Sequence, residues 1–146
     1  MEISGAPRRL RGTPSWLLNQ TAVRAQRLVA DALGEVGARR YHYSLLAALD
    51  EFGPASQADL GRRGGLDRSD VVATLNELAD GGFVERAPDP ADRRRNVVTL
   101  TPSGAAHLRR LDRVLRQAQD ELLAPLSAAE REELARMLNV VLGHRG

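Results

Sequence analysis

The chain has 146 residues, of which 42% are hydrophobic and 27% are charged, values typical of a globular domain with its own core. Aromatic residues make up 3% and cysteine is absent, so Leu, Val and Ala must build the interior, and disulfides and thiolate sites are excluded. All 21 basic residues are arginine, yet the net charge is only +2. Evidence for a nucleic-acid partner must therefore come from local clusters.

The N-terminal region predicts a flexible arm followed by helices. Residues 1–13 combine glycine, proline and three arginines, which is typical either of a disordered tail or of an arm that touches DNA. They lack an apolar signal core, and no apolar run is long enough to span a membrane, so we expect a cytoplasmic protein. Apolar residues recur at helical spacing over 15–36, and a second helix is expected over 39–52.

The central region predicts two short helices joined by a glycine turn. Ser56 is expected to cap the first helix, over 57–63, before the turn at Gly64 and Gly65. Asp67 is expected to cap the second helix, with Asp70 completing a capping box. The second helix carries an apolar stripe, expected to be buried, of Val71, Val72, Leu75, Leu78 and Ala79. This is the helix-turn-helix arrangement.

Two short strands with a cationic turn follow the second helix. Residues 83–87 and 96–101 are typical of strands, and the prolines and aspartates between them break regular structure. Three consecutive arginines, 93–95, lie in the turn. A ribbon with a cationic tip suits a nucleic-acid groove, although a solvated charge run is the simpler alternative. With the helix-turn-helix, it predicts a winged helix.

Two further helices complete the predicted fold. The first begins near Pro102 and carries an apolar seam over 108–122, and the second is capped by Ser127 with Glu130 as its capping-box partner. The fold class expected is therefore mainly α (α+β), a winged helix-turn-helix between N- and C-terminal helices.

The second helix of the helix-turn-helix is the expected reading element. Arg68 can grip guanine through two hydrogen bonds. Asp70 can accept from cytosine N4, or it can act only as a cap residue. The alternative for the whole helix is an ordinary amphipathic surface helix. The arginines at the ribbon tip would enter the narrow minor groove, and Asp92 is expected to pair with an arginine and hold the loop in shape.

Residues 60–104 contain the pattern D-P-x-D-R-R followed by L-T-x-x-G, formed by Asp89, Pro90, Asp92, Arg93, Arg94, Leu100, Thr101 and Gly104. With this pattern, the span of about 15–143 resembles the MarR family of bacterial transcriptional regulators. The resemblance implies a homodimer with entwined terminal helices, here 14–37 and 102–146, and a winged-helix lobe over 38–101. It also implies that Arg94 inserts into the minor groove. A small phenolic or anionic ligand commonly lowers DNA affinity in that family.

These inferences define the candidate site residues. The expected DNA contacts come from the helix-turn-helix and the ribbon: Ser56, Gln57, Arg62, Arg68, Ser69, Asp70, Thr74, Arg86, Arg93, Arg94 and Arg95. Tyr41, His42 and Tyr43 are candidates for ligand binding, with structural roles as the alternative. No cofactor or metal is expected, because the three histidines are far apart in sequence, although folding could gather them with acidic residues.

The function expected is a sequence-specific transcriptional regulator, most often a repressor in this family, acting as a homodimer on a palindromic operator. The alternative is a winged-helix protein-interaction module without DNA binding. The acidic Asp70 and Glu77 on the expected reading face favour that alternative. An enzyme is not expected, because no cysteine nucleophile, phosphate-binding loop or metalloprotease motif is present.

Overall fold

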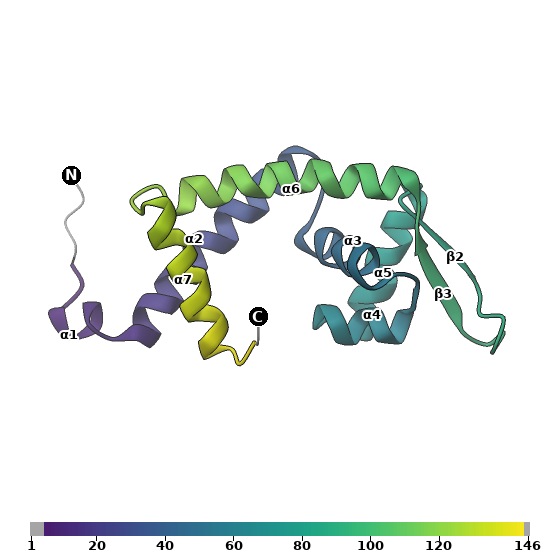
Figure 1. Ribbon diagram of the computed structural model, residues 1–146, viewed down its shortest axis with the longest axis horizontal. Coiled ribbons are helices and arrows are strands. Elements are labelled where there is room, and N and C mark those ends of the chain that lie inside the picture. The colour runs from purple at the N-terminus through teal and green to yellow at the C-terminus, as the bar shows by residue number, and fades with distance from the viewer. Residues whose placement is uncertain (1–4, 145–146) are drawn as a thin grey trace. The chain divides into compact units, whose positions relative to one another are not determined.

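The computed structural model describes residues 5–144. In chain order its elements are α1 (Arg8–Arg11), α2 (Pro14–Glu35), α3 (Arg40–Phe52), β1 (Ala55–Ser56), α4 (Gln57–Gly64), α5 (Arg68–Asp80), β2 (Val84–Pro88), β3 (Asn96–Leu100), α6 (Pro102–Leu122) and α7 (Ala128–Val141). The mainly helical winged helix-turn-helix predicted from the sequence is confirmed, with a small antiparallel sheet (Figure 1).

The chain divides into two compact units, and α2 and α6 each contribute to both. One unit is Val29–Leu115, which we call the lobe; the other combines Met1–Leu28 with Arg116–Gly146. The lobe is larger than the predicted 38–101 because Leu33 of α2 and Leu108 and Leu111 of α6 are buried in its core. Residues that precede and follow the predicted winged helix therefore pack into its core.

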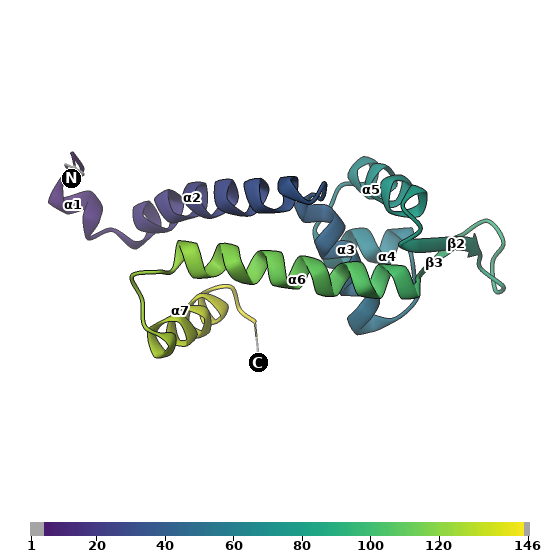
Figure 2. The ribbon, with the colours of Figure 1, turned by 90° about the horizontal axis from the view of Figure 1, so that it is seen from above.

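Leucine dominates the core of the lobe, as the low aromatic content predicts. Its fully buried side chains come from five helices and β3: Leu33, Leu45, Leu46, Leu60, Leu75, Leu78, Leu111 and Val98. The sheet has the order β1-β3-β2, with Val84 opposite Leu100 and Pro88 opposite Asn96. Beyond Pro88 the two strands continue into the loop of the wing, the β2–β3 ribbon that extends past the helices (Figure 2).

Helix ends in the lobe follow local capping chemistry, with one exception. The hydroxyl of Ser56 accepts a hydrogen bond from the backbone N–H of Asp59, as expected for the cap of α4. The α4–α5 turn places Gly65 at φ 65°, a left-handed conformation that suits glycine. Asp67 precedes α5 but its side chain makes no cap hydrogen bond, so the capping box predicted with Asp70 does not form.

The β3–α6 junction explains why the chain has threonine at 101 and glycine at 104. The Thr101 hydroxyl donates to the carbonyl of Gly82 at 2.7 Å and accepts from the backbone N–H of Gly104 at 3.0 Å. A Cβ on Gly104 would overlap the carbonyl oxygen of Phe83. The junction therefore fastens the start of α6 to the start of the wing.

The second unit contains the terminal helices. The predicted arm of residues 1–13 includes one helical turn, α1, within its described part, while residues 1–4 lie outside the described residues, as do 145 and 146. Ser127 and Glu130 form the capping box predicted for α7. Within residues 5–144, no helix is both long and apolar enough to cross a membrane.

Candidate nucleic-acid interface

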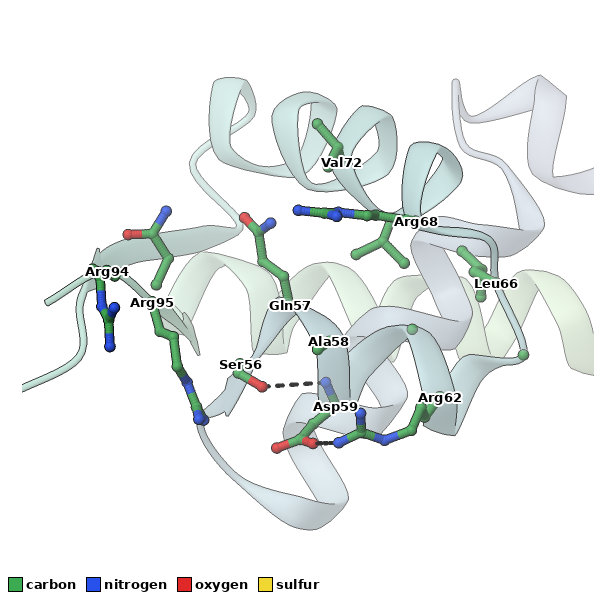
Figure 3. Close-up of a pocket in the computed structure, with 14 residues that line it drawn as sticks. Ser56, Gln57, Ala58, Asp59, Arg62, Leu66, Arg68, Val72, Arg94 and Arg95 are labelled. Carbon is green, nitrogen blue, oxygen red and sulfur yellow. Dashed lines mark hydrogen bonds and ion pairs between the residues drawn. The ribbon is translucent and has the colours of Figure 1, made fainter. Parts of the chain in front are cut away.

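A concave surface of about 880 Å³ lies between α4, the start of α5 and the wing (Figure 3). Four arginines from three separate parts of the lobe border it: Arg62 of α4, Arg68 of α5, and Arg94 and Arg95 of the wing. We call it the basic concavity. The residues lining it also include Ser56, Gln57, Val72 and Asn96. Asp59 also lines this surface, and the excess of arginines over that one carboxylate favours a polyanionic partner.

Helix α4 forms one wall of the basic concavity. Ser56 and Gln57 stand at its N-terminus, where the Ser56 side chain is already engaged as the cap. Arg62 forms an ion pair with Asp59 on the same helix, and its side chain remains exposed. Gln57 has its amide between Arg68 and the wing arginines in Figure 3. Three of the predicted contact residues, Ser56, Gln57 and Arg62, thus share this wall.

Helix α5 exposes a face that differs from the predicted one at two positions. Thr74 is only 5% exposed and packs inside the lobe, so we remove it from the candidate DNA contacts. Val72, expected in the buried stripe, is 38% exposed. Successive residues turn by about 100° around a helix, so the buried face centred on Val71, Leu75 and Leu78 includes Thr74 and turns Val72 outward.

The exposed residues of α5 are Arg68, Ser69, Val72, Ala73, Asn76, Glu77 and Asp80. Asp70 is half-buried, and neither it nor Ser69 lines the basic concavity.

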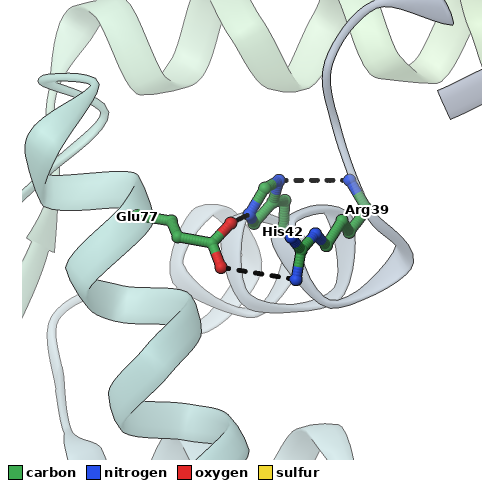
Figure 4. Close-up of polar contacts among 3 residues, drawn as sticks. All are labelled: Arg39, His42 and Glu77. Carbon is green, nitrogen blue, oxygen red and sulfur yellow. Dashed lines mark hydrogen bonds and ion pairs between the residues drawn. The ribbon is translucent and has the colours of Figure 1, made fainter. Parts of the chain in front are cut away.

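The acidic side chain of Glu77 is paired with basic groups beside α5 (Figure 4). His42 of α3 accepts the backbone N–H of Arg39 at Nδ1, so its proton lies on Nε2, which donates to the Glu77 carboxylate at 2.9 Å. The Arg39 guanidinium lies 3.6 Å from the other carboxylate oxygen. We call this group the α3–α5 clamp. The clamp offsets the charge of Glu77, one of the two acidic residues that favour the protein-interaction alternative.

The wing tip is ordered by its own backbone and by Asp92. The backbone N–H of Asp89 donates to the carbonyl of Arg95 at 2.8 Å, and that of Arg95 donates to the carbonyl of Asp92 at 2.9 Å. The Asp92 carboxylate accepts from the backbone N–H and Nε of Arg94 at 3.1 and 3.2 Å. Asp92 thus pairs with a wing arginine; its support of DNA binding stays a prediction. Arg93 is exposed but does not line the basic concavity.

Arg86 connects the wing to the reading helix. Its guanidinium donates to the side-chain oxygen of Asn76 at 2.7 Å. Arg86 was predicted as a DNA contact, and its hydrogen bond to Asn76 was not expected. The pairing of an exposed β2 residue with an exposed α5 residue depends on the fold, and no local pattern indicates it.

The sequence profile of the MarR family matches residues 37–95. The chain is 34% identical over 97 residues to the HTH-type transcriptional repressor NicR of Pseudomonas putida, covering 66% of this chain and 61% of NicR. It is 31% identical over 110 residues to the HTH-type transcriptional repressor Rv2887 of Mycobacterium tuberculosis, covering 75% and 79%. The chain belongs to the MarR family.

A solved MarR structure also shares the fold. Mutant MarR from E. coli complexed with operator DNA superimposes with a TM-score of 0.73 at 25% identity, covering 86% of this chain and 91% of that one. The match to NicR leaves about two fifths of that protein unaligned.

The three residues proposed for a MarR-type ligand site have separate partners. Tyr41 accepts a hydrogen bond from Arg40, whose guanidinium also stacks over its ring, and His42 belongs to the α3–α5 clamp. Tyr43 donates to Asp112 of α6 at 2.7 Å. That hydrogen bond, with burial and the Asp112 charge, raises the pKa of Tyr43 to about 12. All three thus have structural roles, and their ligand role stays a prediction.

An aromatic stack that the sequence did not indicate lies between α6 and the start of the wing. The ring of His107 on α6 stacks on Phe83 with ring centroids 4.1 Å apart. Burial, and after it Arg110 and His42, lower the pKa of His107, which favours the neutral ring. Between residues 5 and 144, no three His, Asp or Glu residues are grouped so that they could hold a metal ion.

Proposed function

We propose that this chain is a sequence-specific DNA-binding transcriptional regulator, a repressor that acts as a homodimer on a palindromic operator. One observation carries the proposal: four arginines from α4, α5 and the wing converge on one concave surface. An arginine cluster on a winged helix has the charge and the donor geometry that phosphate and base edges require. A regulator of this kind acts where bacterial DNA lies, in the cytoplasm.

The family relationship supports the proposal. NicR and Rv2887 are named as HTH-type transcriptional repressors, and a MarR structure of the same fold contains operator DNA. In a helix-turn-helix the second helix enters the major groove, which here is α5. The wing arginines would then reach the neighbouring minor groove, where Arg94 is the residue expected to insert.

The terminal helices support a homodimer. Within its described residues, the second unit contains an apolar groove formed by α2, the end of α6 and α7, with Leu17, Leu18, Leu134 and Met137 among its lining residues. Val140 and Val141 of α7 are also exposed, by 63% and 74%. Apolar surface of this kind is stable in water when a second copy covers it. In a palindromic operator, the two copies of α5 would lie about 34–36 Å apart.

Release by a small phenolic or anionic effector is the regulatory part of the proposal. An effector acts if it binds better to a dimer whose α5 helices have the wrong spacing. A preference of about 1.4 kcal/mol for that state lowers DNA affinity tenfold. Tyr41, His42 and Tyr43 are the candidate contacts, and each would have to exchange its present partner for the ligand.

The test is a double substitution at the wing, Arg93→Ala with Arg94→Ala. Operator fragments are first selected from genomic DNA by the wild-type protein, and binding is measured between about 50 and 200 mM salt. We expect the wing variant to lose at least tenfold in affinity and to show a shallower salt dependence, because two phosphate-facing charges are removed from each protomer. Sedimentation should show an unchanged dimer.

The matched control is Arg109→Ala with Arg113→Ala, which removes the same charge from exposed positions of α6 away from the basic concavity. It should leave operator affinity within about twofold. Equal loss in both variants would mean that only net charge matters. No salt-sensitive binding by the wild type would favour the protein-interaction alternative, which now rests on Asp70 because Glu77 is paired within the lobe.

A further inference from the structure

Val72 is an unusual residue for the surface on which it lies. In the lobe, Val29–Leu115, whose residues are all described, the exposed large apolar side chains are Phe52 and Val72. The ring of Phe52 is covered by the Arg63 guanidinium at 4.7 Å. Val72 instead lines the basic concavity among arginines and polar side chains (Figure 3). The surface proposed to face DNA thus contains an exposed isopropyl group.

The position of Val72 on α5 places it one turn after Arg68. Residues four apart lie on the same helix face, separated by about 6 Å along the axis. Both side chains line the basic concavity, and Ala73 beside Val72 is exposed and too small to shield it. The first two turns of a reading helix are the part that reaches base edges. Arg68 and Val72 therefore have the spacing to address neighbouring base pairs.

The major groove of DNA offers one apolar group for such a side chain. Guanine, cytosine and adenine present only hydrogen-bonding groups there, whereas thymine adds its C5-methyl group. A valine that faced guanine, cytosine or adenine would desolvate polar edges without replacing their hydrogen bonds. Against a thymine methyl it would bury apolar surface at no such cost.

We propose that Val72 reads the C5-methyl group of a thymine, within about two base pairs of a guanine held by Arg68, in each half of the operator. The proposal rests on the proposed function, because it requires that α5 enters the major groove. It adds a specificity residue that makes no hydrogen bond and that acts through shape and apolar contact alone.

The experiment replaces thymines of the selected operator by deoxyuridine, one symmetric pair at a time. Uracil keeps the base pairing and removes only the methyl group. For the wild-type protein we expect one position in each half-site at which the replacement weakens binding, by about fourfold per methyl group lost from contact. In Val72→Ala the same replacement should have no effect, because the side chain that covers the methyl is gone.

Two comparisons make the result specific. Alanine is the better helix former, so Val72→Ala should keep α5 folded, which circular dichroism can check. Phe52→Ala removes the other exposed apolar side chain of the lobe, away from the basic concavity, and should retain the full uracil effect. A uracil scan without any sensitive position, or one equally sensitive in Val72→Ala, overturns the inference while leaving the proposed function intact. If the wild type enriches no sequence at all, both are wrong.

Discussion

At the β3–α6 junction, two single residues allow the start of α6 to pack against the start of the wing. The Thr101 hydroxyl is bonded both to Gly82, just before β2, and to Gly104 in α6. One oxygen atom therefore links the start of the wing to the start of α6. Gly104 allows the close approach because the Phe83 backbone occupies the space of a side chain. The L-T-x-x-G part of the sequence pattern is therefore explained by packing, without reference to DNA.

Gly104→Ala should destabilise the lobe by about 1–3 kcal/mol, since the new methyl group must displace backbone and not a flexible side chain. The measurement is the urea midpoint at fixed protein concentration. Gly34→Ala is the matched control, because Gly34 lies in α2 with no heavy atom within 4 Å of an added Cβ. It should gain about 0.5–1 kcal/mol from helix propensity. Similar midpoints for the two variants would contradict the packing explanation.

At the scale of elements, the α3–α5 clamp holds the reading helix against α3. His42 is buried, at 8% exposure, and has both ring nitrogens bonded. Glu77 is thus the partner that satisfies a buried donor and also the contact that ties α5 to α3. The exposed Arg39 adds little, because surface ion pairs contribute less than about 1 kcal/mol.

Glu77→Ala should lower the free energy of unfolding by about 1–3 kcal/mol, because the His42 N–H is left buried without an acceptor. Glu77→Gln keeps an oxygen at the same place and should cost much less. Arg39→Ala should be close to the wild type. Urea unfolding of the three variants checks the order, and a cost for Arg39→Ala as large as that for Glu77→Ala would show that the ion pair, and not the histidine, matters.

Most elements could be predicted from local sequence, whereas contacts between residues far apart in the sequence could not. Ser56 and Ser127 cap α4 and α7 as predicted, because each cap involves residues only three apart. Thr74 was predicted to be exposed because it is polar, and Val72 to be buried because it is apolar. Their positions around α5 give the opposite result: Thr74 is buried and Val72 is exposed. The His42–Glu77 contact joins residues 35 positions apart, and Arg86 and Asn76 meet across elements. The sequence patterns contain no record of such pairs.

At the scale of the whole molecule, the apolar surface of the second unit has to be covered for the proposed function. Pro14, Leu17 and Leu18 of α2 face the same groove as Met137 and Val141 of α7. The apolar character of these side chains is not explained by burial in a core or by contact with DNA. A second copy of the chain does, and it would also supply the second reading helix that a palindrome requires.

Met137→Arg should dissociate the dimer, because a guanidinium buried in an apolar interface without a partner costs at least about 3 kcal/mol, or two orders of magnitude in Kd. Operator binding should fall with it. Ala129→Arg places the same charge on an exposed α7 position that does not line the groove and should leave both unchanged. Sedimentation equilibrium gives the dimer Kd, and an intact Met137→Arg dimer would place the interface elsewhere.

The guanidinium groups around the basic concavity also determine which chemical modifications can regulate it. Lysine is the usual target of acetylation, and none occurs among these 146 residues. An acetyltransferase therefore has no lysine side chain here to neutralise. Lysine acetylation therefore cannot remove positive charge from the basic concavity, whereas methylation of its arginines would keep the charge and block bidentate hydrogen bonds.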